Sequence, residues 1–100
     1  MDINIKEENG GFVAMFDGRL DTPAAVKAQQ DMTPLMENAD KEITLDCEKL
    51  EYISSSGLRI LLNIYKHTRK NSRRAIIRHA SDYVEEVLRT GGFLQLYEIE

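Results

Sequence analysis

Three consecutive hydroxyl side chains, Ser54, Ser55 and Ser56, are the residues of this chain best suited to chemistry. They lie between a segment with the pattern of a buried strand and a segment with a strong helical period. The first turn of a helix carries free backbone N–H groups and a partial positive charge. Hydroxyls at such a place can cap the helix, act as a nucleophile or accept a phosphate. The residues alone leave these three roles open.

Catalysis is the least supported of the three roles. A nucleophilic serine needs a positioned base and a group that orients this base. His67 and His79 stand in no recognisable motif, and the chain has neither a Gly-x-Ser-x-Gly elbow nor a Walker-type glycine-rich loop. The histidines and the single Cys47 also lack the spacing of a metal site, and Cys47 is expected to be a small core residue. We therefore predict a protein that is not an enzyme and needs no cofactor or metal.

Composition narrows the class of protein further. The 100 residues suit one domain, 1–100, and the proportions of 42% hydrophobic and 30% charged residues predict a folded chain. A net charge of −4 argues against nucleic acid or an anionic membrane as the main partner. No apolar stretch approaches the roughly 20 residues of a membrane span, and the first residues do not resemble a signal peptide. We expect a cytoplasmic protein.

The serines are positioned by an alternation of predicted strands and helices. Alternating or continuous apolar residues predict strands at 3–5, 12–16, 43–47 and 75–77, with a last short edge strand within 93–99. Helices are predicted after Asp21, after the serines, and from Ser81 to the Gly91-Gly92 stop. Pro34 predicts a kink in the first helix, or two shorter helices with Thr33 capping the second. This order predicts an α/β sheet with at least some parallel pairs.

Three ordered blocks of the sequence resemble the STAS domain, the fold of bacterial anti-sigma factor antagonists. The central block is the segment 43–59, in which a strand with Asp46 leads through Tyr52 and Ile53 into Ser-Ser-Ser-Gly-Leu. The segment 18–21 looks like the family's Gly-x-Leu-Asp, and the segment 84–93 looks like its last helix and glycine turn. The resemblance implies a four- to five-stranded mixed β-sheet with helices packed mainly on one face.

The resemblance also implies a function in partner switching. Aligned on Gly57, Ser55 corresponds to the serine that an anti-sigma factor with protein kinase activity phosphorylates in this family. The implied partner-binding residues around it are Asp21, Ser54, Ser56, Gly57, Tyr52 and Ile53. Ser54 departs from the best-studied members, which carry Asp there. The unphosphorylated protein would bind the kinase and so release a sigma factor, phosphorylation would end this binding, and a protein phosphatase would restore it.

Other interpretations of these residues stay open at this stage. At least one serine is expected to cap the helix, Asp21 is a suitable N-cap, and Tyr52 and Ile53 suit either the core or an exposed patch. The main functional alternative is a STAS subunit that docks constitutively in another assembly, such as a phospholipid-transport ABC complex. In either case we expect no direct nucleic-acid binding, and a monomer or weak dimer.

Overall fold

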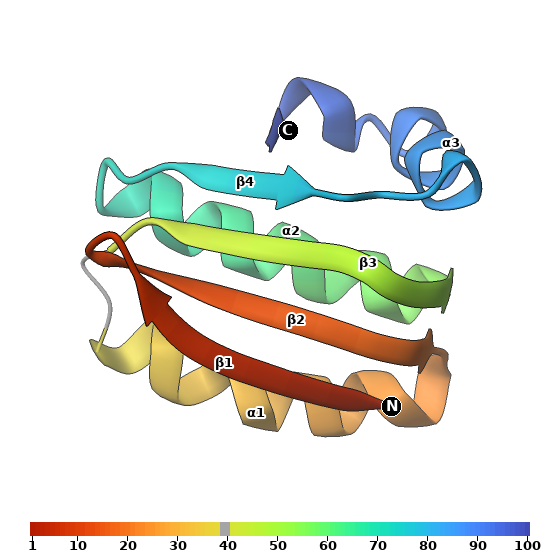
Figure 1. The fold of residues 1–100 in the computed structure, drawn as a ribbon, viewed down its shortest axis with the longest axis horizontal. Helices are drawn as coiled ribbons and strands as arrows, with labels where there is room; N and C mark the ends of the chain where they lie inside the picture. The colour runs from red at the N-terminus through yellow and green to blue at the C-terminus, as the bar shows by residue number, and fades with distance from the viewer. Residues whose placement is uncertain (39–40) are drawn as a thin grey trace.

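Strands and helices alternate along the chain after an N-terminal hairpin (Figure 1). The computed structural model describes residues 1–38 and 41–100, with no account of the side chain of Asn38. The elements are β1 (Asp2–Glu8), β2 (Gly11–Leu20), α1 (Thr22–Asn38), β3 (Ile43–Ile53), α2 (Ser55–Lys70), β4 (Ala75–Arg78), α3 (Asp82–Thr90), a 3-10 helix (Phe93–Gln95) and β5 (Glu98–Ile99). None of the helices in these residues is long and apolar enough to cross a membrane.

The five strands form one mixed sheet in the order β1-β2-β3-β4-β5. β1 pairs antiparallel with β2 through a turn at Asn9 and Gly10, whose φ angles are 54° and 80°. Positive φ at both central residues is the geometry that an Asn-Gly hairpin favours. The other three pairs, β2 with β3, β3 with β4 and β4 with β5, are parallel. The predicted mixed α/β sheet is confirmed.

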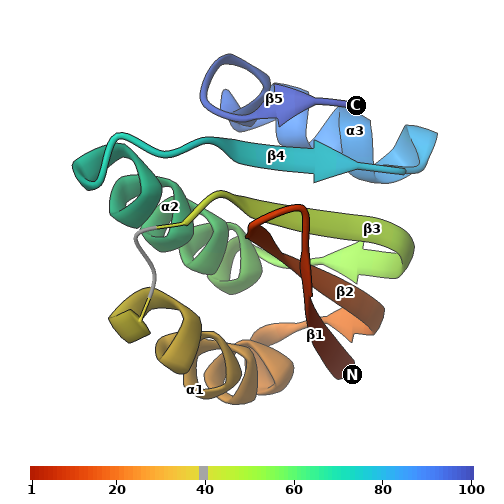
Figure 2. The same cartoon turned by 60° about the vertical axis from the view of Figure 1, so that its left-hand side comes forward.

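The hydrophobic core lies between one face of the sheet and the helices. Figures 1 and 2 show α1 and α2 side by side on the same face, and buried Val84 and Leu88 of α3 belong to the same core cluster. Side chains alternate across a strand, so Leu45 and Cys47 of β3 point into this core whereas Asp46 lies on the opposite face. The expectation that the helices pack mainly on one face is confirmed.

The two central strands are longer than the sequence pattern predicts. We expected β2 to end at Asp17-Gly18 and β3 to end at Cys47, yet they run on together to Leu20 and Ile53. The register shifts between Met15 and Asp17, and again between Gly18 and Arg19. Gly18 has a φ of 114°, which a residue with a side chain rarely adopts. Bulges of this kind interrupt the alternation of side chains without ending the strand.

Of the two outcomes expected at Pro34, the pair of shorter helices is wrong: α1 is one continuous helix, and the Thr33 hydroxyl donates to the Gln29 carbonyl oxygen at 2.7 Å instead of capping a second helix. The short edge strand expected within 93–99 is confirmed as β5, but it has only two residues and follows a 3-10 helix at Phe93–Gln95. Tyr97 explains this local choice, because its ring lies in the core 6.0 Å from the ring of Tyr65 and its hydroxyl donates to the Leu61 carbonyl oxygen of α2. Tertiary packing here overrides the strand pattern.

Cys47 is predicted to react with thiol reagents only when the protein unfolds. Its side chain is 1% exposed, and burial together with the charge of Asp46 raises its pKa to about 12. At neutral pH the thiolate, which is the reactive form, is therefore scarce and shielded. Labelling with a thiol reagent should be at least about 100-fold slower in buffer than in denaturant. Equal rates in the two conditions would contradict the burial of this residue.

Candidate functional site

The serines begin α2 directly after the end of β3. Ser54 is the N-cap residue, with extended backbone angles, and its Oγ accepts a hydrogen bond from the Gly57 N–H at 3.1 Å. The first turn of this helix contains no acidic residue. The helix therefore starts with one of its free N–H groups satisfied by a neutral hydroxyl, and its partial positive charge is not offset by a carboxylate within that turn. This confirms that one serine caps the helix.

The Ser54 hydroxyl also connects this helix to the end of β2. Its Oγ donates to the Leu20 carbonyl oxygen at 3.0 Å, and the Ser54 N–H donates to the same oxygen at 2.9 Å. The hydroxyl thus acts as donor and acceptor at once. An aspartate at position 54 could accept from the Gly57 N–H but has no proton for the Leu20 oxygen when it is ionised. This geometry gives a physical reason for serine at position 54, where the best-studied members of the family that the sequence resembles carry Asp.

Ser55 and Ser56 have different surroundings from Ser54. Ser55 is the first residue of α2 and is exposed, whereas Ser56 is half-buried. Because Ser54 donates its hydroxyl proton to a backbone carbonyl, its oxygen is poorly placed to attack or accept a group. Of these three serines, Ser55 is the one that is exposed and so accessible to another protein.

Asp21 lies at the same edge of the sheet as the serines. It follows Leu20, the residue to which Ser54 is bonded, and it caps α1 by accepting a hydrogen bond from the Ala24 N–H at 3.0 Å through Oδ1. The expected capping role is confirmed, and the side chain remains half-buried rather than fully enclosed. The starts of α1 and α2 therefore present a carboxylate and a hydroxyl on one surface, since both helices follow parallel strands that end at the same edge.

Gly57 and Ile53 support this surface from beneath. Gly57 is buried, and a Cβ atom there would lie 2.8 Å from Cγ of Leu20 and 3.0 Å from Cγ1 of Ile53. Ile53 is 4% exposed and belongs to the core. The glycine thus lets α2 approach the end of β2 closely.

Tyr52 is the aromatic residue of the predicted partner-binding set. It is half-buried, and the guanidinium of Arg19 lies 4.4 Å from the centre of its ring. A cation over an aromatic face at this distance is favourable. Tyr52 and Ile53, which the sequence pattern treats alike, therefore separate into a surface residue and a core residue because neighbouring strand residues face opposite sides.

A groove between α1 and α2 opens next to Ser56, and sequence reasoning did not identify it. Its volume is about 440 Å³. Its lining residues come from facing positions of the two helices: Thr22, Ala25, Val26, Gln29, Gln30, Ser56, Arg59, Ile60 and Asn63. Val26 is 64% exposed, more than any other large hydrophobic residue among those described. Only the packing of α1 against α2 brings these side chains together; Gln29 and Asn63, for example, are 34 residues apart in the sequence, so no local pattern signals the groove.

Substituting Ser54 by Ala is predicted to destabilise the protein by about 1–2 kcal/mol. The change removes the cap on the Gly57 N–H and the side-chain bond to the Leu20 oxygen, each worth roughly 1 kcal/mol or less in a partly exposed setting. Urea denaturation measures the free energy of unfolding. Ser55→Ala is the matched control and should change it by less than about 0.5 kcal/mol, because this side chain is exposed. Equal losses would contradict the assignment of the cap.

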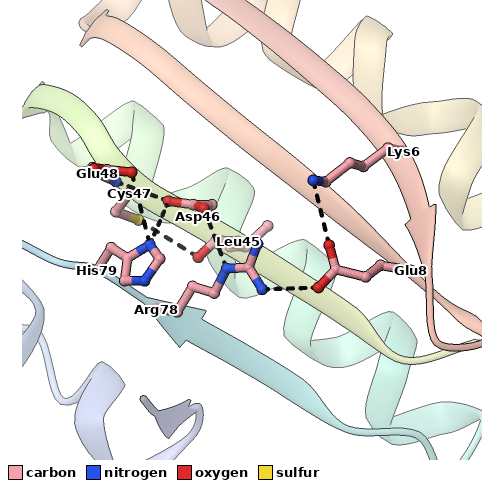
Figure 3. Close-up of polar contacts among 8 residues, drawn as sticks. All are labelled: Lys6, Glu8, Leu45, Asp46, Cys47, Glu48, Arg78 and His79. Carbon is pink, nitrogen blue, oxygen red and sulfur yellow. Dashed lines mark hydrogen bonds and ion pairs between the residues drawn. The ribbon is translucent and has the colours of Figure 1, made fainter.

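A second polar cluster lies on the face of the sheet that the helices leave open (Figure 3). Asp46 of β3 is 5% exposed; its Oδ2 accepts from Nε of Arg78 at 3.2 Å, and its Oδ1 accepts from the Glu48 N–H at 3.0 Å. Arg78 also reaches Glu8 of β1 at 3.3 Å. Burial opposes ionisation of Asp46, but the Glu48 N–H, Arg78 and His79 outweigh it and hold the pKa of Asp46 below its ordinary value. This carboxylate is therefore charged at neutral pH.

A mixed sheet covered on one face, with a serine-capped helix following its central strand, defines a class of small domains. A model of the STAS domain family matches residues 2–100, and the chain belongs to this family. The chain is also 24% identical over 99 residues to BtrV of Bordetella bronchiseptica, a protein assigned as an anti-sigma factor antagonist. That match covers 99% of this chain and 85% of BtrV.

Solved structures have the same fold. The anti-sigma factor antagonist (STAS) domain protein from Planctomyces limnophilus superposes with a TM-score of 0.89 at 19% identity, covering 98% of this chain and 87% of that one. The antagonist SpoIIAA in its unphosphorylated form gives a TM-score of 0.77 at 17% identity, covering 99% and 87%. Phosphorylated SpoIIAA from Bacillus gives 0.76 at 17% identity, covering 99% and 91%. At these identities the likeness establishes the fold.

Proposed function

We propose that this protein is an anti-sigma factor antagonist that works by partner switching in the cytoplasm. In its unphosphorylated form it binds an anti-sigma factor that is also a serine kinase, and so frees a sigma factor. The kinase phosphorylates Ser55, which ends the binding, and a protein phosphatase reverses the modification. The protein regulates transcription without contacting nucleic acid and without catalysing a reaction itself. The observation that carries this proposal is the division of roles between the first two serines.

Ser54 and Ser55 are adjacent in sequence but chemically distinct. The Ser54 hydroxyl bonds to the Leu20 oxygen and the Gly57 N–H, so it holds two elements together. Ser55 is the first residue of the helix and is exposed, so a kinase active site can reach it. Phosphate at the start of a helix is favoured by the helix dipole and by nearby N–H groups. The modification is therefore expected to leave the fold intact.

The phosphate is instead expected to change the free energy of binding to the partner. At pH 7 a phosphoserine adds a charge of about −1.5 to −2. A docking surface formed by Ser55, Ser56, Tyr52 and Asp21 already contains one carboxylate, whose position is fixed by the Ala24 N–H. A complex that buries this surface must desolvate the new dianion and hold it near Asp21. Both terms oppose binding and can exceed the few kcal/mol that hold a signalling complex.

The relatives support this proposal in two ways. BtrV is assigned as an anti-sigma factor antagonist and matches nearly the whole chain. SpoIIAA has structures in both the unphosphorylated and the phosphorylated form, and the two superpose on this chain almost equally well, with TM-scores of 0.77 and 0.76. A fold shared by both forms suits a switch that acts through surface charge rather than through refolding.

The proposal is tested by incubating the protein with ATP and its cognate anti-sigma factor kinase and mapping the product by mass spectrometry. We expect one phosphate, on Ser55. Ser54→Ala and Ser56→Ala are controls that should still accept it, and Ser55→Ala should not. Phosphate on Ser54 or Ser56 in the wild type would contradict the assignment of the acceptor.

The alternative function, constitutive docking in another assembly, makes the opposite prediction. Ser54 locks the start of α2 in place through backbone bonds that do not depend on any modification, and this rigidity also suits a permanent interface. In that case the protein would bind an ATPase subunit of a transport complex tightly and would receive no phosphate. The phosphorylation experiment and a binding measurement with such a subunit together distinguish the two functions.

We propose that the groove between α1 and α2 extends the docking surface for the same anti-sigma factor. It is continuous with the serines through Ser56, and Val26 exposes its apolar side chain there. Val26→Asp is therefore predicted to weaken binding to the anti-sigma factor at least about tenfold, since a buried, unpaired carboxylate opposes association.

Tyr83→Asp is the matched control for this prediction. Tyr83 is also an exposed large hydrophobic residue, 48% exposed, but it lies on α3, outside the groove. Isothermal titration calorimetry measures both variants, and thermal melts confirm that each is folded. Equal weakening by the two substitutions, or none by Val26→Asp, would exclude the groove from the interface.

A further inference from the structure

Three potential metal ligands converge on the open face of the sheet: Asp46 and Glu48 of β3, and the distant residue His79. Nδ1 of His79 lies 3.3 Å from Oδ1 of Asp46 and 4.0 Å from Oε2 of Glu48. All three donor atoms lie within 4.8 Å of one another. Figure 3 shows the imidazole pointing toward both carboxylates. The sequence spacing gave no indication of this cluster, because His79 is 33 residues away from Asp46.

The backbone explains why these side chains meet. Asp46 and Glu48 are two residues apart around the centre of β3, and such residues point to the same face of a strand. β4 runs parallel to β3 with Arg78 opposite Asp46, and His79 is the next residue along the chain. The Asp46 carboxylate is fixed by the Glu48 N–H and by Arg78, so one ligand is already held in place.

The spacing of the donor atoms suits a small divalent cation. Nitrogen and oxygen ligands bind Zn²⁺ at about 2.0–2.2 Å in a tetrahedron, which places neighbouring donors about 3.3–3.5 Å apart. The distance between His79 and Asp46 already has this value at 3.3 Å. Oε2 of Glu48 lies 4.0 Å from Nδ1 of His79 and must come closer to reach this spacing; its side chain is 71% exposed and can move.

The local charge also favours a cation. The cluster contains three carboxylates, those of Glu8, Asp46 and Glu48, and the guanidinium of Arg78. Arg78 compensates one of the three negative charges and leaves an excess of two. Lys6 pairs with Glu8 at 3.4 Å and reduces this excess to one. A bound ion would thus meet a site whose carboxylates outnumber the cations paired with them.

We propose that Asp46, Glu48 and His79 bind a divalent transition-metal ion of the Zn²⁺ type, with water completing its coordination. One imidazole nitrogen and two carboxylate oxygens suit Zn²⁺ better than Mg²⁺ or Ca²⁺, which prefer oxygen ligands alone. The ion connects β3 to the residue that follows β4, so it stabilises the folded protein. This site is independent of the serines and of the proposed switch.

The test is a titration of the metal-free protein with ZnCl₂, followed by isothermal titration calorimetry and thermal melting. We expect one Zn²⁺ to bind with half-saturation below about 0.1 mM, and to raise the melting temperature. Glu48→Gln and His79→Asn should each weaken binding at least about tenfold, because each removes a direct ligand. Both variants should fold, since the two side chains are exposed and Asn tolerates the positive φ of 60° at position 79.

Two substitutions serve as matched controls. Glu51→Gln removes the same charge from an exposed position on the same strand, and His67→Asn removes the other imidazole. Neither should change the affinity for Zn²⁺. The proposal is overturned if the wild type binds no Zn²⁺ at 1 mM (about tenfold above the expected half-saturation). It is equally overturned if Glu48→Gln or His79→Asn binds as well as the wild type does.

Discussion

Ser55→Asp is expected to bind the anti-sigma factor kinase at least about 100-fold more weakly than the wild type, whereas Ser55→Ala binds within about threefold. A 100-fold loss corresponds to roughly 2.7 kcal/mol, which one desolvated, unpaired carboxylate close to Asp21 can supply. The real phosphate carries up to twice this charge, so its effect should be larger. Isothermal titration calorimetry with the purified kinase measures each affinity.

The loss must arise at the interface and not from unfolding. An aspartate on the first residue of α2 interacts favourably with the helix dipole, so Ser55→Asp should be as stable as the wild type or slightly more stable. Ser72→Asp provides a matched control, because it introduces the same charge at an exposed serine just beyond the opposite end of α2. If Ser72→Asp weakened binding as much as Ser55→Asp, general repulsion between two acidic proteins would replace the local switch as the explanation.

Gly57→Val is expected to destabilise the protein by about 3 kcal/mol or more. Even a single Cβ atom at this position would lie 2.8 Å from Cγ and 2.9 Å from Cδ2 of Leu20, and Leu20 is fully buried. Overpacking a core costs about 1–3 kcal/mol for small additions, and valine adds two methyl groups beyond Cβ. The gain in helix propensity on replacing glycine, at most about 1 kcal/mol, does not offset this. Urea denaturation gives the free energy of unfolding.

Two further variants separate the clash from other causes. Arg59→Val places the same side chain at an exposed position of the same helix and should cost less than about 1 kcal/mol. Leu20→Ala removes the atoms that the new side chain meets, so the double variant Leu20→Ala with Gly57→Val should be more stable than the sum of the single losses predicts. Strict additivity would show that the contact between Gly57 and Leu20 does not limit this position.

The effects expected for Ser55→Asp and Gly57→Val assign different roles to two residues of the segment 54–57. Gly57→Val should disturb the support of the helix, because this residue is buried against β2. Ser55→Asp should leave the support intact and change only what a partner meets. A docking surface that stays rigid while its charge changes allows a covalent modification to act as a switch, since the free energy of binding changes without a cost in folding.

Local sequence patterns predicted the parts of this site that depend on neighbouring residues. A serine before a strong apolar period predicts a helix cap, and Asp21 before Thr22-Pro23 does the same; both caps are present. The order of strands and helices also follows from such patterns, since the period of apolar residues differs between the two. The register shifts between β2 and β3 were not predicted, because an extra residue in β3 breaks the alternation on which strand prediction depends.

The remaining features depend on contacts between distant segments. The Ser54 hydroxyl bonds to an oxygen 34 residues away, and this long-range bond helps to distinguish Ser54 from Ser55. The groove beside Ser56 needs α1 and α2 to pack side by side, and His79 reaches Asp46 only because β3 and β4 are adjacent and parallel. The sequence contains each of these residues but gives no signal of the pairing. The structural difference between Ser54 and Ser55 and the presence of the groove therefore could not be predicted without the fold.

The most direct measurement of the central claim compares one protein in two covalent states. The protein phosphorylated on Ser55 is separated from the unmodified protein, and the affinity of each for the anti-sigma factor kinase is measured by isothermal titration calorimetry, before and after treatment with a serine phosphatase. We expect the unmodified form to bind, the phosphorylated form to bind at least about 100-fold more weakly, and the phosphatase to restore binding in full. A phosphorylated form that binds as tightly as the unmodified one would contradict the proposed switch.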